Sequence, residues 1–265
     1  SDLDGTLLGN PEAAHRFKSV WEAIDPDRRP LLCYNSGRLV SDVRELLKSE
    51  PLPAPDYIVG GVGTQMFDCA RDAPVDDFDQ RFRSGWDLAR IEEVLGPFPG
   101  VTRQPAGFLH PYKSSWYLPQ ASPETLEELR ARLVAVGLEV SIVYSSSRDL
   151  DVLPANTDKG QALGWLCGGL ALPLSEVLVA GDTANDSSMY LLPGVRGIVV
   201  ENAQPQLARE VLVTELALGE RSRLATQDDA LGLVGDELTA FGEELNELIP
   251  RAGLGVARTE LERAF

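Results

Sequence analysis

Stretches in which apolar residues recur every three or four positions alternate along this chain with short, almost continuously apolar runs. The first pattern is typical of amphipathic helices, and the second of strands that are buried on both faces. Their alternation predicts an α/β fold, a doubly wound parallel sheet of the Rossmann type with helices on both faces. Asn10 and Pro11 supply an N-cap and a first turn for the first helix. The expected strands are 31–35, 57–59, 177–180 and 197–200, and the expected helices are 11–24, 40–47, one beginning at Asp158-Lys159, 204–216 and 229–248.

The middle of the chain, from 68 to 154, has a different order of predicted helices and strands. Its helices and strands do not alternate in the βα order, which predicts an α+β domain inserted into the sheet domain. We therefore expect a core made of 1–70 and 155–265 and an inserted domain at 71–154. The proline- and acid-rich stretch 71–79 is expected to be an exposed connection and a hinge. The elements expected in the insertion are helices 86–95 and 123–136 and strands 113–118, 139–144 and 150–153.

The sequence opens directly on SDLDGT at 1–6, with no apolar strand before its two acids. A buried strand normally delivers such a pair to the carboxyl edge of a sheet. We therefore interpret Ser1 as a position partway into a longer natural chain. At the other end, 251–265 is rich in arginine and glutamate, and both a helix and a frayed terminus fit it.

The chain of 265 residues carries 24 lysines and arginines against 41 acidic residues, a formal net charge of −17. An excess of acid repels a phosphate backbone, so we expect no nucleic-acid partner. An anionic substrate would need a local positive potential to bind to this acidic chain, supplied by a metal ion, a lysine or a helix N-terminus. No window approaches the roughly 18 apolar residues of a membrane span, and no leader is apparent, so we expect neither membrane insertion nor secretion.

The three cysteines, Cys33, Cys69 and Cys167, are widely separated and form no CxxC pair. His15 and His110 do not stand at a spacing typical of zinc ligands. Reduced, structural thiols in a cytoplasmic protein are the simplest interpretation.

Four polar clusters each lie at the end of an expected strand or the start of a helix. The first is 2–6, where Asp2 and Asp4 share a direction and suit either a shared divalent cation or the roles of nucleophile and general acid. The second is 34–38, where a serine hydroxyl and free backbone N–H groups at a strand-to-helix turn suit a phosphate oxygen. Each also has an alternative without any function, which is a solvated loop for the first cluster and an ordinary helix cap for the second.

The third cluster is Asp158-Lys159-Gly160, which opens a helix. A lysine in a first helical turn gains nothing from the helix dipole unless an anion lies in front of it, although a solvated lysine is the common alternative. The fourth is VLVAGDTAND at 177–186, a buried strand and a glycine turn followed by Asp182 and Asp186, which offer oxygen ligands for Mg²⁺. All four clusters, in this order and in one α/β frame, argue against a chance arrangement.

The four clusters resemble, in order, the motifs of the haloacid dehalogenase-like superfamily of aspartate-nucleophile phosphatases. The matching positions are 2–6, Ser36, Lys159 and 181–182 with Asp186. The resemblance extends to about residue 245 and implies that the insertion is a cap domain of the larger α/β kind. Within the superfamily the chain is similar to the sucrose-phosphate phosphatase family, on the strings SDLDGT at 1–6, GVGT at 61–64, YKSSW at 112–116, YSS at 144–146, DLDVLP at 149–154, GIVV at 197–200 and NAQP at 202–205.

This resemblance implies a mechanism. Asp2 attacks phosphorus and forms an aspartyl-phosphate, while Asp4 protonates the leaving sugar oxygen and then deprotonates the attacking water. Asp2, Asp182 and the backbone carbonyl of Asp4 hold Mg²⁺, and Asp186 completes the metal site by fixing a bound water or Lys159. Lys159 also balances the phosphate charge. The residues implied in phosphate or sugar binding are Ser36, Gly37, Gln65, Lys113, Asp149, Asp151 and Asn202.

Substrate choice is expected in the cap, and here the chain departs from the family at one position. Gln65 stands where the family string Gly-x-Gly-Thr/Ser is followed by glutamate, and an amide bonds hydroxyls differently from a carboxylate. The expected substrate is therefore sucrose-6-phosphate or a related disaccharide phosphate. For Lys113, a surface position on a cap strand is an equally open alternative.

Two other functions compete with a phosphatase. A sugar phosphomutase of the same superfamily would need a cationic cap pocket for a second phosphate. Arg83, Arg90 and Arg103 are the candidates for it, but they form no cluster in the sequence. A phosphatase-like regulatory domain of a sucrose-phosphate synthase is the alternative from another class, and such a synthase is the macromolecular partner or fusion that the resemblance implies. The presence of every catalytic acid argues against a regulatory domain.

Overall fold

The computed structural model of the chain describes residues 1–200, 202–207, 211 and 223–225. Two groups of strands, in the orders β1-β2-β3-β4 and β11-β10-β9, come from the two ends of the chain. These strands are β1 (Cys33–Asn35), β2 (Tyr57–Gly60), β3 (Gln65–Asp68), β4 (Ala73–Pro74), β9 (Leu178–Gly181), β10 (Arg196–Val200) and β11 (Arg223–Ala225).

The opening residues of the chain join the two groups into one sheet. The Asn35 N–H donates to the Ser1 carbonyl over 2.8 Å, and the Asp2 N–H donates to the Ala180 carbonyl over 2.8 Å. Ser1 and Asp2 therefore lie between β1 and β9, at the centre of the sheet. This arrangement brings the first acid of the chain beside the end of β9, which precedes Asp182 in the sequence.

Most of the sheet is parallel, as the sequence predicts. The pairs β1–β2, β9–β10 and β10–β11 are parallel, whereas β3 pairs with β2, and β4 with β3, in antiparallel fashion. The antiparallel edge was not predicted, because runs as short as β3 and β4 carry no readable period. The helices beside the sheet are α1 (Pro11–Ala23), α2 (Val40–Leu46), α5 (Lys159–Gly169), α6 (Ser187–Tyr190) and the 3₁₀ helices η1 (Phe78–Phe82), η3 (Leu174–Glu176) and η4 (Ala184–Asp186).

Two neighbouring residues of β2 show that both faces of the sheet are covered. Ile58 belongs to the buried cluster that contains Phe17 of α1, and Val59 belongs to the cluster that contains Ala162 of α5. Successive strand residues point to opposite faces, so helices pack on each side. The predicted N-cap of α1 is confirmed, since the Asn10 side chain accepts hydrogen bonds from two backbone N–H groups of the first turn.

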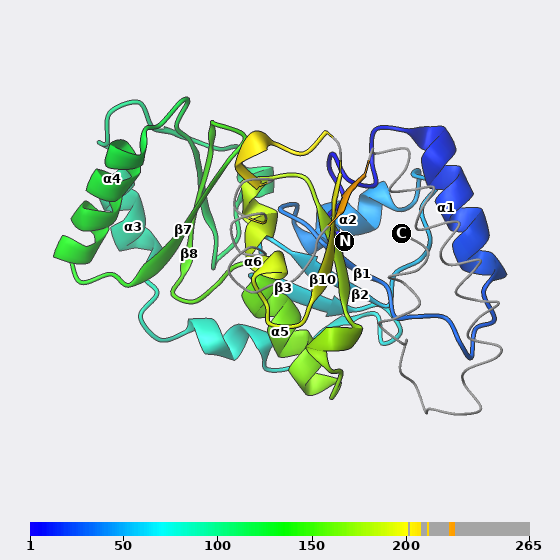
Figure 1. Ribbon diagram of the computed structural model, residues 1–265. Helices are drawn as coiled ribbons and strands as arrows, with labels where there is room; N and C mark the ends of the chain where they lie inside the picture. The colour runs from blue at the N-terminus through cyan, green and yellow to red at the C-terminus, as the bar shows by residue number, and fades with distance from the viewer. Residues whose placement is uncertain (201, 208–210, 212–222, 226–265) are drawn as a thin grey trace.

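A second, antiparallel sheet in the order β5-β6-β8-β7 lies in the middle of the chain, with two helices on one face (Figure 1). Leu150 and Val152 of β8 pack with Leu129 of the second helix in a separate buried cluster. The alternation of the strand turns Asp149 and Asp151 to the opposite face. The elements are α3 (Leu88–Leu95), β5 (Thr102–Arg103), η2 (Ala106–Phe108), β6 (Ser114–Tyr117), α4 (Pro123–Ala135), β7 (Val140–Ser145) and β8 (Asp149–Pro154).

The predicted helices and strands that fall within the described residues are all present, with ends shifted by a few positions. The stretch 71–79 is largely exposed as predicted, although β4 pairs within it and Phe78 is buried. Most of the expected helix 204–216, and all of the expected helix 229–248 and of the tail 251–265, lie outside the described residues.

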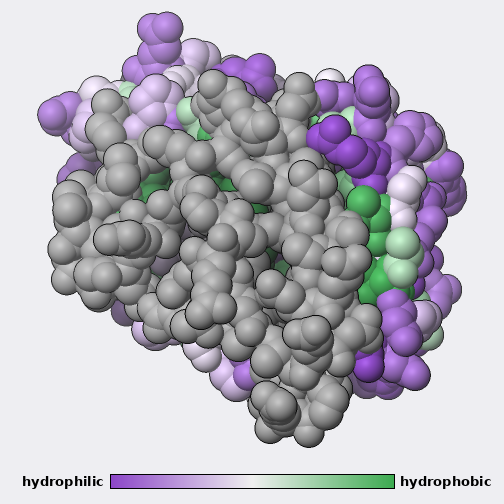
Figure 2. Space-filling model, turned by 45° about the vertical axis from the view of Figure 1, so that its right-hand side comes forward, coloured by the Kyte–Doolittle hydropathy of each residue, from purple (hydrophilic) through white to green (hydrophobic). Residues whose placement is uncertain are grey.

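The described surface in Figure 2 is mostly hydrophilic, with a smaller apolar area at one side. Among the described residues, no helix combines the length and the apolar character that crossing a bilayer requires.

Candidate active site

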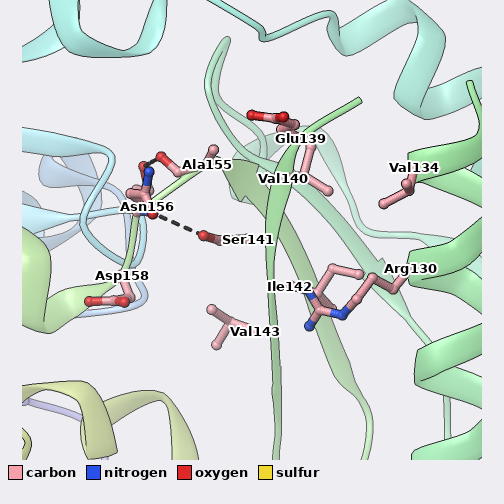
Figure 3. A pocket seen from close by; sticks show the side chains of 11 residues that line it. Arg130, Val134, Glu139, Val140, Ser141, Ile142, Val143, Ala155, Asn156 and Asp158 are labelled. Carbon is pink, nitrogen blue, oxygen red and sulfur yellow. Dashed lines mark hydrogen bonds between the residues drawn. The ribbon is translucent and has the colours of Figure 1, made fainter. Parts of the chain in front are cut away.

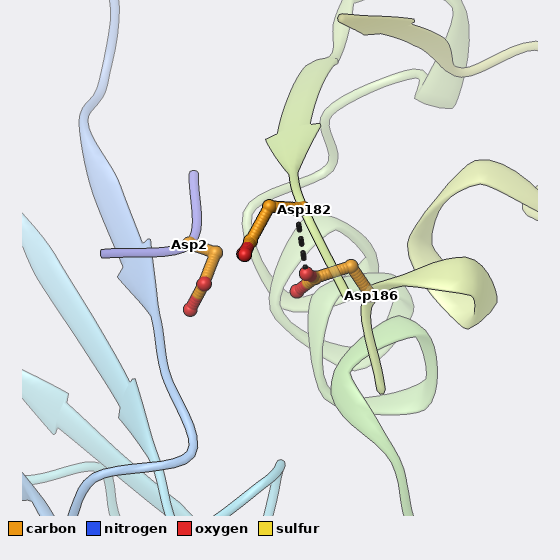
Figure 4. A group of neighbouring side chains, drawn as sticks. All are labelled: Asp2, Asp182 and Asp186. Carbon is orange, nitrogen blue, oxygen red and sulfur yellow. Dashed lines mark hydrogen bonds between the residues drawn. The ribbon is translucent and has the colours of Figure 1, made fainter. Parts of the chain in front are cut away.

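Three acidic side chains from segments far apart in the chain meet at the centre of the main sheet (Figure 4). Asp2 lies between β1 and β9, Asp182 directly follows β9, and Asp186 ends η4. Each offers a carboxylate oxygen within 4.8 Å of the others. All three residues are buried, at 4%, 8% and 0% exposure in that order. We call them the acidic cluster.

The side chain of Lys159 lies against the acidic cluster. Its Nζ is 2.8 Å from Asp2 Oδ1 and 2.6 Å from Asp186 Oδ1, and the residue is fully buried. Asp158 caps the helix, since its carboxylate accepts from the Gln161 N–H over 2.7 Å. The sequence predicts that this first-turn lysine faces a negative group, and the structure places two carboxylates there.

Asp186 is held by hydrogen bonds on both oxygens. Oδ1 accepts from Lys159, and Oδ2 accepts from the backbone N–H groups of Asp182 and Thr183 over 3.0 and 2.9 Å. Gly181 is required here, because a Cβ at that position would overlap the Asp186 carboxylate. Asp186 therefore fixes the turn after β9 and orients Lys159, and the oxygens left for a ligand belong mainly to Asp2 and Asp182.

The cluster concentrates more negative charge than its single lysine neutralises. Burial raises the pKa of Asp2 to about 6, against the opposing effect of Lys159. Burial, together with the charges of Asp2 and Asp186, raises the pKa of Asp182 to about 8. Burial alone would lower the pKa of Lys159, but the two carboxylates outweigh it and raise that pKa above its ordinary value. The site thus favours either protons or another cation.

The donor set of the acidic cluster fits a hard divalent cation. Carboxylate oxygens are the ligands that Mg²⁺ prefers, and a few carboxylates suffice because the ion keeps several waters. The turn after Asp4 approaches Asp182 closely: Gly5 has φ +80°, and a Cβ there would overlap the Asp182 carboxylate. Thr6 Oγ1 donates to Asp182 Oδ1 over 3.4 Å, which helps to orient it. The acidic cluster is therefore a candidate Mg²⁺ site.

The second motif forms a turn beside the cluster. Ser36 is fully buried, and its Oγ accepts from the Arg38 N–H over 3.1 Å. The Cα of Gly37 faces Asn185, since a Cβ built there would lie 3.9 Å from the Asn185 amide nitrogen. The loops after β1 and β9 therefore adjoin, as expected for carboxyl ends of parallel strands. Ser36 and Gly37 are placed beside the fourth motif.

Asp4 does not join the acidic cluster with its carboxylate. Both of its oxygens accept from the Arg38 guanidinium, Oδ2 from Nε over 2.7 Å and Oδ1 from Nη2 over 2.6 Å. The Asp4 side chain is half exposed, unlike the buried Asp2. Arg38 stands within the second motif, but no role was predicted for it from the sequence. The signal was an arginine that directly follows a turn of the kind that binds phosphate.

On the antiparallel sheet, Lys113 lies in a buried polar group with Ser115 and Asp151. Its Nζ is 2.7 Å from Ser115 Oγ and 2.9 Å from Asp151 Oδ1, and Lys113 is only 3% exposed. Burial contradicts the alternative of a surface lysine. A Cβ built on Gly61 would lie 3.6 Å from Lys113 Cδ, so this group borders the turn between β2 and β3. Ser115 was not among the site residues predicted from the sequence. The signal was its spacing, because residues two apart on a strand, such as Lys113 and Ser115, point to the same face.

The other predicted substrate residues have local partners. Asp149 lies 3.2 Å from Arg148, and the Gln65 amide oxygen accepts from the Val40 N–H over 3.0 Å, which caps α2. Asn202 donates to the Gly5 carbonyl over 2.7 Å. Gln65 therefore supports the helix that follows the second motif, and Asn202 lies against the turn of the first.

Two of the three arginines considered for a second phosphate site lie beside acidic side chains. Arg83 lies 3.9 Å from Asp79, and Arg103 pairs with Glu92. Their charges are balanced by local acids, which disfavours a cationic pocket for a mutase.

The described residues also line a pocket of about 490 Å³ at the edge of β7 (Figure 3). It is bounded by Val140, Ile142 and Val143 of that strand, by Arg130 of α4 and by the segment 155–158. None of the acidic cluster lines it, so it is separate from the candidate active site.

The doubly covered sheet with its inserted antiparallel sheet is the fold of solved haloacid dehalogenase-like hydrolases. Residues 1–236 match the family model described as sucrose-6F-phosphate phosphohydrolase. The chain belongs to this family and is a phosphatase, a hydrolase of phosphoric monoesters.

Individual relatives agree with this assignment. The chain is 46% identical over 207 residues to a mannosylfructose-phosphate phosphatase of Agrobacterium fabrum, covering 78% of this chain and 84% of the relative. It is 34% identical over 216 residues to sucrose-phosphatase 2 of Nicotiana tabacum, covering 78% of this chain and 50% of the relative. The chain thus spans about half the length of that plant relative.

The fold is similar to that of a sucrose-phosphatase from Synechocystis, solved in complex with sucrose and phosphate. The TM-score is 0.77 at 28% sequence identity, with 89% of this chain and 95% of the other covered.

Proposed function

We propose that the chain hydrolyses a disaccharide phosphate, with sucrose-6-phosphate and mannosylfructose phosphate as the first candidates. Both are fructose-containing sugar phosphates, and relatives are named for each. The observation that carries the proposal is the buried Asp2 carboxylate, held by Lys159 over 2.8 Å within reach of Asp182. A carboxylate with fixed orientation and a balancing cation is equipped to act as a nucleophile.

In this mechanism Asp2 forms a bond to phosphorus as the bond from phosphorus to the sugar oxygen breaks. Asp4 gives a proton to the leaving oxygen and then takes one from the water that cleaves the aspartyl-phosphate. Lys159 orients Asp2, while Ser36 and the Gly37 N–H bind the phosphate. Mg²⁺, held by Asp2, Asp182 and the Asp4 carbonyl, would supply positive charge to the phosphoryl oxygens.

We propose that 71–154 forms a cap over a core of 1–70 and 155–265. The polar face of the antiparallel sheet carries Lys113, Ser115 and Asp151, and Lys113 borders the core turn at Gly61. Side chains that are buried and hydrogen-bonded can discriminate strongly between sugar hydroxyls, because an unmatched polar group is costly. Asp149, Gln65 and Asn202 complete the proposed substrate-binding set.

A cytoplasmic location and a sucrose-phosphate synthase partner stay predictions. They follow from the resemblance and the composition, and neither changes the proposed reaction.

The test is phosphate release from sucrose-6-phosphate, mannosylfructose phosphate and simple hexose phosphates, with and without Mg²⁺. We expect turnover of at least one disaccharide phosphate that needs Mg²⁺, and almost complete loss in Asp2→Asn. Near-normal hydrolysis by Asp2→Asn would refute the nucleophile. Movement of phosphate between two positions of a hexose, without release, would favour a mutase.

A further inference from the structure

We propose that Arg38 is a positioning residue for Asp4. In this view the guanidinium fixes the carboxylate that protonates the leaving sugar oxygen, and Arg38 does not itself bind the substrate. The inference rests on the proposed function, since it concerns the residue that serves as acid and base there.

The contact between the two side chains fixes both the position and the plane of the carboxylate. Nε and Nη2 of Arg38 each donate to a different oxygen of Asp4, over 2.7 and 2.6 Å. A two-pronged contact of this kind restrains rotation of the carboxylate, which one hydrogen bond does not.

Arg38 is presented from a rigid turn. Its N–H donates to Ser36 Oγ over 3.1 Å, and its carbonyl accepts from the Gly61 N–H over 2.7 Å. Gly60 packs against the same carbonyl, where a built Cβ would lie only 3.0 Å away. The backbone of Arg38 is thus fixed by the second motif on one side and by the turn after β2 on the other.

Asp4 belongs to a different turn from Arg38. It lies in the turn after Leu3, whose carbonyl accepts from the N–H groups of Leu7 and Leu8 over 3.0 and 2.9 Å. The Asp4 side chain is 50% exposed and that of Arg38 40% exposed. An exposed ion pair adds little to stability. The contact therefore serves orientation, and its removal should leave the fold intact.

Orientation matters most when the leaving group needs a proton. A sugar alkoxide is a poor leaving group and must be protonated as its bond to phosphorus breaks, whereas nitrophenolate leaves without a proton. A misplaced acid therefore slows the first substrate and spares the second.

The experiment compares the first turnover of sucrose-6-phosphate and of p-nitrophenyl phosphate in the presence of Mg²⁺. The variants are Arg38→Ala, Arg38→Lys, Asp4→Asn and the double variant Arg38→Ala with Asp4→Asn. Arg44→Ala is the matched control, because Arg44 is a half-exposed arginine on α2 that pairs with Asp72 and lies outside the site. Rapid mixing separates the first turnover from later hydrolysis of the aspartyl-phosphate.

For Arg38→Ala we expect sugar release in the first turnover to fall by about 10- to 100-fold, with KM within about twofold of the wild type. Release of nitrophenolate should change by less than about threefold and then slow, because the second step also uses Asp4. Arg38→Lys should lose less activity than Arg38→Ala but stay below the wild type, since a lysine cannot donate to both carboxylate oxygens in the planar geometry of a guanidinium. Arg38→Ala should add nothing in the Asp4→Asn background.

Three results would overturn the inference. Equal losses with both substrates, additive losses in the double variant, or a raised KM with unchanged turnover would each assign Arg38 to the substrate phosphate or to the fold. A wild-type chain inactive on every sugar phosphate, or a fully active Asp4→Asn, would instead refute the proposed function. The two failures are therefore distinguishable.

Discussion

Replacing Lys159 by methionine should strongly destabilise the metal-free protein. Lys159 is fully buried, with Nζ 2.8 Å from Asp2 and 2.6 Å from Asp186. Methionine nearly preserves the volume and removes the charge, so two buried carboxylates lose their shared cation. Removing one partner of a buried ion pair typically costs about 3–5 kcal/mol, because the remaining charge stays desolvated. For a chain of this size, such a loss lowers the melting temperature by about 6–20 °C.

The loss of stability in Lys159→Met should grow with pH. Lys159 is charged in both states between pH 5 and 8, because its pKa is raised above 10.5 in the folded protein. In the variant, the carboxylates lose the influence that lowers the pKa of Asp2, so they bind protons in the folded state that the unfolded chain has released. The free energy of unfolding then falls as pH rises. We expect a larger difference from the wild type at pH 8 than at pH 5.

Urea unfolding with a chelator present, followed by circular dichroism, measures both effects. Lys48→Met is the matched control, because Lys48 makes an exposed ion pair with Glu45 and should lose less than about 0.5 kcal/mol. A difference below about 1 kcal/mol for Lys159→Met at pH 8, or equal differences at both pH values, would refute the idea that this lysine compensates buried charge.

Three further predictions follow from the same contacts. Burial and neighbouring acids raise the pKa of Asp182 to about 8, so Mg²⁺ must displace a proton when it binds. The affinity of the protein for Mg²⁺ should therefore rise by up to about tenfold per pH unit below pH 8 and level off above it. Calorimetry in two buffers measures this, and a pH-independent affinity contradicts it. Lys113→Met should lower kcat/KM for the disaccharide phosphate by about 10- to 100-fold and leave p-nitrophenyl phosphate within about twofold; equal losses would remove Lys113 from substrate recognition. Gly160→Ala should cost about 1–3 kcal/mol in urea unfolding, because its Cβ would overlap the Ser188 carbonyl, whereas Gly168→Ala meets nothing within 4 Å and should not destabilise. Equal stability of the two glycine variants would contradict that packing argument.

The meeting of Asp2, Asp182 and Asp186 could be predicted because it follows from topology. Lys159 follows β8 of the other sheet, and its anionic neighbour was expected from its place in a first helical turn. In a parallel sheet the carboxyl ends of strands lie on one edge, so residues that follow different strands converge there without any knowledge of their side-chain contacts. The same logic placed Ser36. The one missing step was the position of the opening segment between β1 and β9, which only the tertiary hydrogen bonds define.

Contacts that depend on side-chain geometry could not be read in this way. The pairing of Arg38 with Asp4 joins two residues 34 positions apart, and neither has a periodic neighbour that signals the other. The cap that the Gln65 amide oxygen gives α2 at Val40 is a second example, since the family string that suggested a role for Gln65 says nothing of this contact. A cap from a distant strand leaves no trace in the local sequence, because the helix start itself lacks a capping residue. Such contacts require the packed structure.

The engagement of Lys159 also changes how an anionic substrate can enter this acidic chain. From sequence, the lysine was expected to balance the phosphate charge, but its ammonium already contacts Asp2 and Asp186. Three carboxylates and one ammonium give a formal charge of −3 + 1 = −2 before any phosphate arrives. The raised pKa values of Asp2 and Asp182, about 6 and about 8, mean that protons relieve this charge progressively as the pH falls below about 8 when no cation is bound. A bound divalent cation would replace those protons, bring the group to neutrality and leave the nucleophile ionised. On this argument the metal is a condition for binding the phosphate as well as for cleaving it, so phosphate affinity should disappear together with Mg²⁺.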